Sequence, residues 1–255
     1  MTEARAFCHD DETLTDLQVG NLKVLQKKQG FRFAIDAVLL AHFAPLKPSW
    51  RVCDLASGSG VIPLLLTTRS HDLAIDAVEL QPSLAEMAQR SLLLNALENI
   101  RVHQADLRTL PPSWQGAYQL VTCNPPCFPL GAGKLSPLPE IALARHELAC
   151  TLADVVTCAA RLLKSGGHFC LIHRPERLSE LLLLCQGAHL APRRLRLVHP
   201  EARANANLLL LDAVKDARPD LRVEAPLIIY SAPGQYSPEM RSLYGGCLLY
   251  TSRCV

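Results

Sequence analysis

Several features that would narrow the function are missing from this sequence of 255 residues. Its apolar runs, such as residues 181–185, are far shorter than the ~18–20 residues that cross a bilayer. Aromatic residues make up only 5% of the chain and the net charge is only +2, so composition alone indicates no class of ligand. Neither an internal repeat nor a low-complexity tract is present, which excludes solenoid and linker proteins. We expect no membrane segment.

Cysteine is abundant, but its spacing is not that of a metal or redox site. None of the 10 cysteines falls in a CxxC pair. Cys123 and Cys127 are four residues apart, and no second Cys/His pair follows at zinc-finger distance. The first residues, MTEARAFCHDDETL, contain no apolar core of a signal peptide. We therefore expect a cytoplasmic protein with free, largely buried thiols and no metal.

What is present indicates a folded α/β chain. Hydrophobic residues make up 49% and charged residues 20%, which excludes wholesale disorder. The length fits one domain with a small appendage, so we predict an N-terminal extension over 1–35 and a main domain over 36–255. Residues 17–33 alternate apolar and polar, which predicts two short strands or a hairpin. Asp36 is predicted to cap a short helix that ends before Pro45.

From residue 51 onward, candidate strands and helices alternate. The expected strands are Arg51–Leu55, Leu73–Glu79, Ile100–Gln104, Tyr118–Cys123, His168–His173, Arg194–Val198 and Asn207–Val214. The expected helices are Val61–Thr68, Ser83–Ala96 and Leu152–Leu163. This alternation predicts a doubly wound, mostly parallel sheet of seven strands. The last two strands are joined by a turn too short for a parallel crossover, so they should form a C-terminal antiparallel hairpin.

The turn after the first of these strands carries a candidate cofactor site, VCDLASGSGVIP. Gly58 and Gly60 permit a sharp bend and close approach to a ligand. Pro63 breaks the dinucleotide pattern G-x-G-x-x-G, and a P-loop would need a lysine. A tight turn that opens with Asp54 suits a cationic, amine-bearing cofactor, and the segment resembles the D-x-G-x-G-x-G turn of enzymes that use S-adenosylmethionine (SAM). The residues expected to hold the cofactor here are Asp54, Ala56 (in place of the usual first glycine), Ser57, Gly58 and Gly60.

Two further carboxylates follow at strand ends. Glu79 ends the second strand, where a carboxylate can accept hydrogen bonds from both ribose hydroxyls. Asp106 follows the third strand and is placed to accept a hydrogen bond from an adenine amino group. A single acidic residue at a strand end is often merely solvated. Three at consecutive strand ends favour cofactor binding.

The fourth strand ends in NPPCF, residues 124–128. The Asn124 side-chain oxygen and the Pro125 carbonyl can both accept hydrogen bonds from one planar NH2 group, which turns the nitrogen lone pair toward a methyl donor. The segment resembles the N-P-P-aromatic motif of enzymes that methylate exocyclic or amide nitrogens. Cys127 stands where the aromatic belongs, and Phe128 can replace it if the loop shifts by one residue. The predicted catalytic set is Asn124, Pro125, Pro126, Cys127 and Phe128, and Asn124 is also expected among the cofactor-binding residues; the alternative is a simple Asn-Pro turn.

Basic residues suggest where a polyanion binds. Residues 161–200 carry seven Lys and Arg residues against two Glu, which fits either a polyanion-binding face or ordinary solvated helices. Residues 128–147 form a long Gly/Pro-rich connection typical of lids and binding loops. The candidate RNA contacts are Lys134 in that connection, and Arg174 and Arg177 at the end of the fifth strand.

Taken together, the chain resembles the bacterial tRNA (adenine-N6) methyltransferases that modify the adenosine beside the anticodon of a valine tRNA, which are class I SAM-dependent enzymes. The resemblance rests on QGFRFAIDAVLLAHFA, the cofactor turn, NPPC, ARHE, LLKSGG, HRPERL, PRRLRLVHP and PLIIYSAPGQYSPEMRSLYGG. It implies SAM as cofactor, tRNA as partner, and a place for Asp36 beside the cofactor. A monomer or weak dimer is expected.

Three other functions fit the same motifs. N-P-P also presents amide nitrogen in protein glutamine methyltransferases, although these usually carry a helical N-terminal domain. A ribosomal RNA guanine-N2 methyltransferase is another possibility. Because Cys127 replaces the stacking aromatic, a SAM- and RNA-binding protein with little catalysis also fits.

Overall fold

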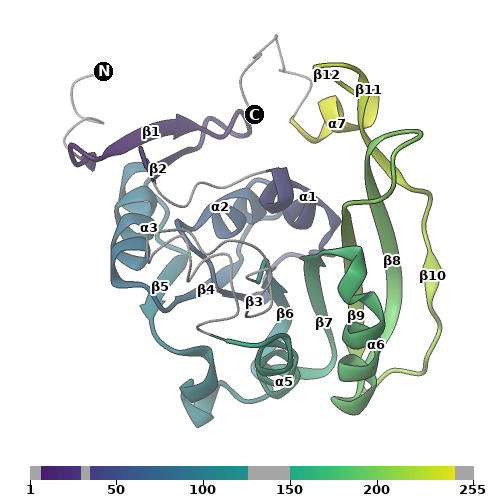
Figure 1. Cartoon of the computed structure of the whole chain (residues 1–255). Helices are drawn as coiled ribbons and strands as arrows, with labels where there is room; N and C mark the ends of the chain where they lie inside the picture. The colour runs from purple at the N-terminus through teal and green to yellow at the C-terminus, as the bar shows by residue number, and fades with distance from the viewer. Residues whose placement is uncertain (1–6, 30–34, 126–149, 245–255) are drawn as a thin grey trace.

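A ten-stranded sheet forms the centre of the protein. The computed structural model describes residues 7–29, 35–125 and 150–244, arranged as in Figure 1. The strands follow the order β12-β11-β8-β9-β7-β6-β3-β4-β5, and β10 pairs with β8 beside this row. Their bounds are β3 (Arg51–Leu55), β4 (Ala74–Glu79), β5 (Ile100–Gln104), β6 (Tyr118–Cys123), β7 (Leu163–His173), β8 (Leu190–Glu201), β9 (Leu208–Lys215), β10 (Arg222–Val223), β11 (Leu227–Ala232) and β12 (Gln235–Tyr236).

The predicted α/β class is confirmed, and the sheet is larger than predicted. Strands β7, β6, β3, β4 and β5 are parallel to one another, whereas β9 is antiparallel to β7. The β8–β9 pair is antiparallel, as the short turn between them requires. Three short strands, β10, β11 and β12, add to the expected seven and extend the sheet beyond β8.

Helices cover both faces of the sheet (Figure 1). One apolar core joins the first face to the helices α1 (Ile35–Phe43), α2 (Val61–Thr67), α3 (Pro82–Leu94) and α7 (Pro238–Leu243). A second core joins the other face to α5 (Leu152–Leu162) and α6 (Leu178–Gly187). Single-turn 3-10 helices lie at η2 (Leu107–Thr109), η3 (Pro112–Trp114) and η4 (Pro175–Arg177). This two-layer burial is why the central strands read as unbroken apolar runs.

The beginning of α1 corrects one prediction. The helix already includes Ile35, so Asp36 lies in its first turn and is not its N-cap. A carboxylate there still interacts favourably with the positive end of the helix dipole. By contrast, α5 begins with a complete capping box, in which the Thr151 hydroxyl accepts from the Asp154 amide and the Asp154 carboxylate accepts from the Thr151 amide.

The N-terminal hairpin is present but lies earlier than predicted. Strands β1 (Glu12–Asp16) and β2 (Lys23–Lys27) pair antiparallel, whereas residues 17–22 form the turn between them. The sequence pattern fails here because Glu12 is buried on a strand of polar residues. Both oxygens of its carboxylate bind the Arg90 guanidinium of α3, at 2.7 Å each. The hairpin thus packs on α3, and the domain boundary at residue 35 stays a prediction.

Among the helices of the part of the chain that the structure describes, none has the length and apolar character to cross a membrane.

Candidate active site

The site expected from the sequence falls where the chain changes direction along the sheet. From β3 the chain continues to β4 on one side and, later, to β6 on the other, so the carboxyl ends of β3 and β6 flank a switch point. Leu55 of β3 and Cys123 of β6 are paired residues, which places the turn after β3 beside Asn124. Open α/β sheets bind ligands at such a point.

The turn between β3 and α2 is held tightly in place. The Ser57 amide donates to the Val78 carbonyl of β4 at 3.0 Å, and the Gly60 amide donates to the Ser57 carbonyl at 2.9 Å. Gly60 has φ +83°, and a Cβ added there would lie 3.3 Å from the Ala88 side chain of α3. Glycine is therefore needed at this position both for its backbone conformation and for the close approach of α3. Ala56 has φ 54°, a conformation that glycine adopts more easily.

Glu79 secures the same turn from the end of β4. One carboxylate oxygen accepts from the Gly58 amide at 2.8 Å and the other accepts from the Gln81 amide at 2.8 Å. Burial raises the pKa of Glu79, and these backbone hydrogen bonds oppose that rise. Each oxygen keeps a second lone pair, so the carboxylate can order the turn and still accept ligand hydroxyls.

Asp54 is a fully buried carboxyl group with one unused oxygen. Its Oδ1 accepts from the Thr122 hydroxyl of β6 at 2.6 Å, whereas Oδ2 has no hydrogen-bond partner. Burial raises the pKa of Asp54 to about 7, and the hydroxyls of Thr122 and Ser57 oppose the rise. The Ser57 hydroxyl lies near this carboxyl group, but its geometry does not complete a hydrogen bond to it or to any other group. Two buried, unsatisfied oxygen atoms at a switch point favour a ligand with cationic and hydrogen-bond-donating groups.

Asp106 is placed differently from the other two carboxylates. It lies two residues past the end of β5, where its Oδ1 accepts from the Arg108 amide at 2.9 Å and caps η2. The Arg108 guanidinium binds both carboxylate oxygens and lowers the pKa of Asp106. Three adjacent strands therefore bear the three carboxylates as predicted. A ligand that binds the Asp106 carboxylate must, however, share it with the Arg108 guanidinium.

Of the predicted catalytic residues, the structure describes Asn124 and Pro125. Asn124 follows β6 directly and is half-buried, while Pro125 is buried. Within the described ranges, the Asn124 side chain makes no hydrogen bond, so its amide oxygen stays available to a substrate. Pro126, Cys127, Phe128 and Lys134 lie outside the described residues.

The end of β7 brings Asp36 and Arg174 together. Burial raises the pKa of Asp36, and the positive charge of Arg174 opposes this rise. The Arg174 guanidinium donates to the Asn207 carbonyl at 3.5 Å, and its amide donates to the His173 ring at 2.7 Å. Burial lowers the pKa of His173 to about 4, so the ring is neutral at pH 7. Asp36 and Arg174 thus lie at the same edge of the sheet as the switch point.

Sequence reasoning missed Thr122 and His173. Thr122 was hidden because a threonine inside an apolar strand reads as an ordinary β-branched residue. Its partnership with Asp54 depends on the pairing of β3 with β6, which is set by tertiary structure. His173 opens the family motif HRPERL, but nothing in the sequence indicates that its ring is fully buried.

The basic stretch at 161–200 does not form one surface. Arg177 donates to Glu180 at 2.5 and 2.8 Å, an ion pair within the first turn of α6. Arg193, Arg194 and Arg196 are also paired with acids, all of them beyond residue 200. Arg174 lies at the carboxyl edge of the sheet, whereas Asp212, a second acidic partner of Arg194, is aligned with Cys170, three residues before the end of β7. Charge counting along the sequence therefore overestimated the free positive charge.

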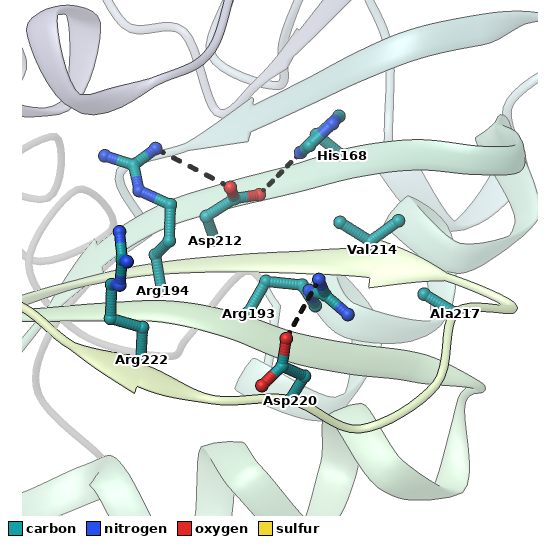
Figure 2. A pocket seen from close by; sticks show the side chains of 8 residues that line it. All are labelled: His168, Arg193, Arg194, Asp212, Val214, Ala217, Asp220 and Arg222. Atoms are coloured by element: carbon teal, nitrogen blue, oxygen red, sulfur yellow. Dashed lines mark hydrogen bonds and ion pairs between the residues drawn. The ribbon is translucent and has the colours of Figure 1, made fainter.

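A pocket of about 650 Å³ lies away from this site. Figure 2 shows the buried Asp212 carboxylate between His168, at 2.9 Å, and Arg194, at 3.7 Å. His168 stacks on Trp50, the residue before β3, so the pocket lies toward the amino edge of the sheet. The residues of the switch point do not line it. Its charges are largely paired with one another.

Potential metal ligands gather at one place in the described ranges, namely His9, Glu12 and Glu86. The Arg90 guanidinium already neutralises both carboxylates there. The absence of a metal stays a prediction. Of the seven cysteines that the structure describes, six are buried and all are free thiols.

The family model and the related sequences agree on one protein family. The family model "Methyltransferase small domain" matches residues 34–184. A tRNA1(Val) (adenine(37)-N6)-methyltransferase from Erwinia tasmaniensis is 36% identical over 61% of this chain and 64% of its own length. Another from Tolumonas auensis is 30% identical over 86% of this chain and 90% of its own length. The first two relatives, from Cronobacter sakazakii and Erwinia tasmaniensis, are matched over less than two thirds of their length, 61% and 64%.

Solved structures agree on the fold. The structure described as a predicted O-methyltransferase, protein Atu636 from Agrobacterium tumefaciens, superposes with a TM-score of 0.67 at 25% identity. It covers 84% of this chain and 98% of that chain. TrmN from Thermus thermophilus superposes with a TM-score of 0.50 at 23% identity, over 70% of this chain and 48% of its own, and supports the fold alone.

Proposed function

Because the chain belongs to the methyltransferase family that includes the tRNA1(Val) (adenine(37)-N6)-methyltransferases, we propose that it methylates the exocyclic N6 of an adenine in tRNA, with SAM as methyl donor. One structural observation carries this proposal. The buried carboxyl group of Asp54, with one unsatisfied oxygen, lies near the end of β3, and the amide of Asn124 directly follows the paired strand β6 at the switch point of the sheet. A cofactor site and an acceptor site thus adjoin one another.

The side chains at the switch point fit SAM. The unused Asp54 Oδ2 and the Ser57 hydroxyl suit the charged amino-acid part of this cofactor, and Glu79 suits its ribose hydroxyls. Asp106 is the candidate partner for its adenine, with Arg108 as competitor. Ala56, Gly58, Gly60 and Asp36 complete the predicted cofactor site. When bound, SAM supplies an electrophilic methyl group on a sulfonium.

Asn124 and Pro125 are the proposed partners of the acceptor nitrogen. The Asn124 side-chain oxygen and the Pro125 carbonyl each accept one proton of the target NH2 group. Holding both protons fixes the direction of the nitrogen lone pair, so the residues act by orientation rather than by removing a proton first. Pro126, Cys127 and Phe128 form the rest of the proposed acceptor loop.

The substrate assignment rests on the relatives and on the edge beside the acceptor. Arg174 follows β7, which adjoins β6 on the side away from β3 and the cofactor turn. Lys134, Arg174 and Arg177 are the proposed phosphate contacts, with Arg177 exchanging Glu180 for RNA. The relatives' shared name favours tRNA over the protein and ribosomal RNA alternatives.

A single substitution separates acceptor from cofactor binding. Asn124→Ala should keep the affinity for SAM within about twofold in calorimetry, because Asn124 holds the acceptor, and should lower methyl transfer to unmodified tRNA by at least about a hundredfold. Asn99→Ala, which removes an amide that binds the Leu73 carbonyl at the amino edge, is the matched control. Full turnover of Asn124→Ala would refute the proposed acceptor site.

A further inference from the structure

Tyrosine is concentrated at one end of the sheet. Three of the chain's five tyrosines form a continuous stack there. The rings of Tyr230 and Tyr236 are 5.3 Å apart with an interplanar angle of 7°, and those of Tyr236 and Tyr244 are 6.0 Å apart at 20°. All three side chains are half-buried. In a chain with 5% aromatic residues, such a cluster is a feature to be explained.

The local backbone holds the stack in a fixed geometry. Tyr230 and Tyr236 are directly paired residues of β11 and β12, so their rings share one face of a hairpin. The Ser237 amide then donates to the Ile229 carbonyl at 2.8 Å, and the Ser237 hydroxyl caps α7 by accepting from the Met240 amide at 3.1 Å. An ion pair of 2.7 Å between Arg196 of β8 and Glu239 ties α7 to the sheet.

The stack continues the edge that carries the acceptor site. Between β6 and β11 lie β7, β9 and β8, so β11 is four strand spacings, about 19 Å, from Asn124. Tyr230 pairs with Glu201, three residues past Val198, and therefore also projects beyond the level of Arg174. On a flat sheet this gives a separation of roughly 25 Å, which is about seven nucleotides at the ~3.4 Å rise of a stacked strand.

Two free positive charges accompany the rings. Arg203 in the turn after β8 and Arg241 on α7 are exposed, and among the described residues neither is paired with an acid. This distinguishes them from Arg194 and Arg196, whose charges are neutralised by Glu224 and Glu239. Unpaired cations next to stacked rings are suited to a ligand that combines phosphates with flat bases.

We propose that unpaired bases of the substrate RNA, within about seven nucleotides of the methylated adenine, stack on the Tyr230 end of this row of rings, because the Tyr236 ring already stacks on both Tyr230 and Tyr244 and serves to hold the platform in place. The proposal rests on the proposed function for the identity of the RNA. Aromatic rings bind bases of any sequence because every base has a π-face, whereas Arg203 and Arg241 hold the phosphates. The rings also pack against the core, and the tests below separate stacking on RNA from this packing.

Kinetics of matched variants give the first test. Tyr230→Leu and Tyr236→Leu should each raise the KM for unmodified tRNA about tenfold, while kcat and the SAM affinity change by less than about twofold. Tyr230→Phe and Tyr236→Phe, which keep the ring, should restore the wild-type KM. Trp50→Leu, which removes a half-buried aromatic at the opposite edge, should leave the KM unchanged. An unchanged KM in the Leu variants, or Phe variants as weak as Leu, would overturn the proposal.

Crosslinking of the wild-type chain gives a second test that needs neither a folded variant nor turnover. 4-Thiouridine is placed in turn at each unpaired position within seven nucleotides of the target adenine, and crosslinked peptides are identified by mass. We expect the tryptic peptide 223–241, which contains Tyr230 and Tyr236, to crosslink from at least one position. Crosslinks confined to other segments would refute the platform. Crosslinks to 223–241 without any methylation would refute the proposed function and leave the platform standing.

Discussion

The buried carboxyl group of Asp54 should make cofactor affinity depend on pH. Its pKa is raised to about 7, so below that pH the free protein holds a proton on Asp54. The positive charge of bound SAM favours the ionised carboxylate, and binding at low pH therefore releases that proton. The affinity for SAM should accordingly rise as the pH increases toward neutrality.

The magnitude follows from the ionised fraction. With a pKa of about 7, roughly a tenth of the molecules carry the carboxylate at pH 6 and roughly three quarters do so at pH 7.5. The dissociation constant should therefore be roughly eightfold larger at pH 6 than at pH 7.5. The same raised pKa also makes folding stability depend on pH, but in the opposite direction. The raised pKa stabilises the folded state most below the ordinary pKa near 4, and this contribution is lost as the pH rises to about 7.

Thr122→Val provides the decisive variant because it changes the pKa of Asp54 without adding a charge. It removes the 2.6 Å hydrogen bond from the Thr122 hydroxyl, and a hydrogen bond to a charged group contributes about 1.5–3 kcal/mol. The pKa of Asp54 should rise by a further ~1–2 units, so the affinity at pH 7.5 should fall at least several-fold.

Calorimetry from pH 5.5 to 7.5, in two buffers with different ionisation enthalpies, measures both affinity and proton release. Asp54→Asn should bind SAM weakly at every pH and release no proton. A pH-independent affinity in the wild type, or a Thr122→Val profile that coincides with it, would show that Asp54 is not the group that meets the cofactor.

Two further predictions concern the turn. Glu79→Gln should weaken SAM binding at least tenfold and lower the free energy of unfolding by about 1–3 kcal/mol, because the new NH2 group cannot accept a hydrogen bond from a backbone amide such as that of Gly58. Calorimetry measures the binding and urea unfolding measures the stability. A variant unchanged in both would contradict the role of Glu79 in the turn. Gly60→Ala should cost at least about 1–2 kcal/mol in urea unfolding, because φ is +83° and the new Cβ would lie 3.3 Å from Ala88. Gly187→Ala, with no atom within 4 Å of its added Cβ, is the control; equal effects would refute the argument.

The central strands were predictable because a strand that is buried on both faces appears in the sequence as a short unbroken apolar run. The predicted bounds of β3, β5 and β6 agree with the structure at both ends, since each is a short run bounded by turn residues. The hairpin β1–β2 was misplaced because its first strand buries Glu12, a residue that pattern reading assigns to the surface. Its burial depends on Arg90, which is 78 positions away in the sequence.

The candidate site, like the fold, was predictable only in part. The glycine turn and the carboxylates were visible as motifs, whereas the Thr122 hydrogen bond depends on strand pairing and the Asp106–Arg108 ion pair on local side-chain geometry. The segment PLIIYSAPGQYSPEM was apparent only as a family motif. Its two tyrosines become a structural unit through the β11–β12 pairing, which a two-residue strand does not reveal by periodicity.

The most direct test of the account is the identity of the product. Unmodified tRNA is incubated with the protein and isotope-labelled SAM, digested to nucleosides and analysed by mass spectrometry, in parallel with Asn124→Ala. The account predicts label in N6-methyladenosine with the wild-type chain and none with Asn124→Ala. Label in any other nucleoside, no label at all, or equal labelling by Asn124→Ala would contradict it.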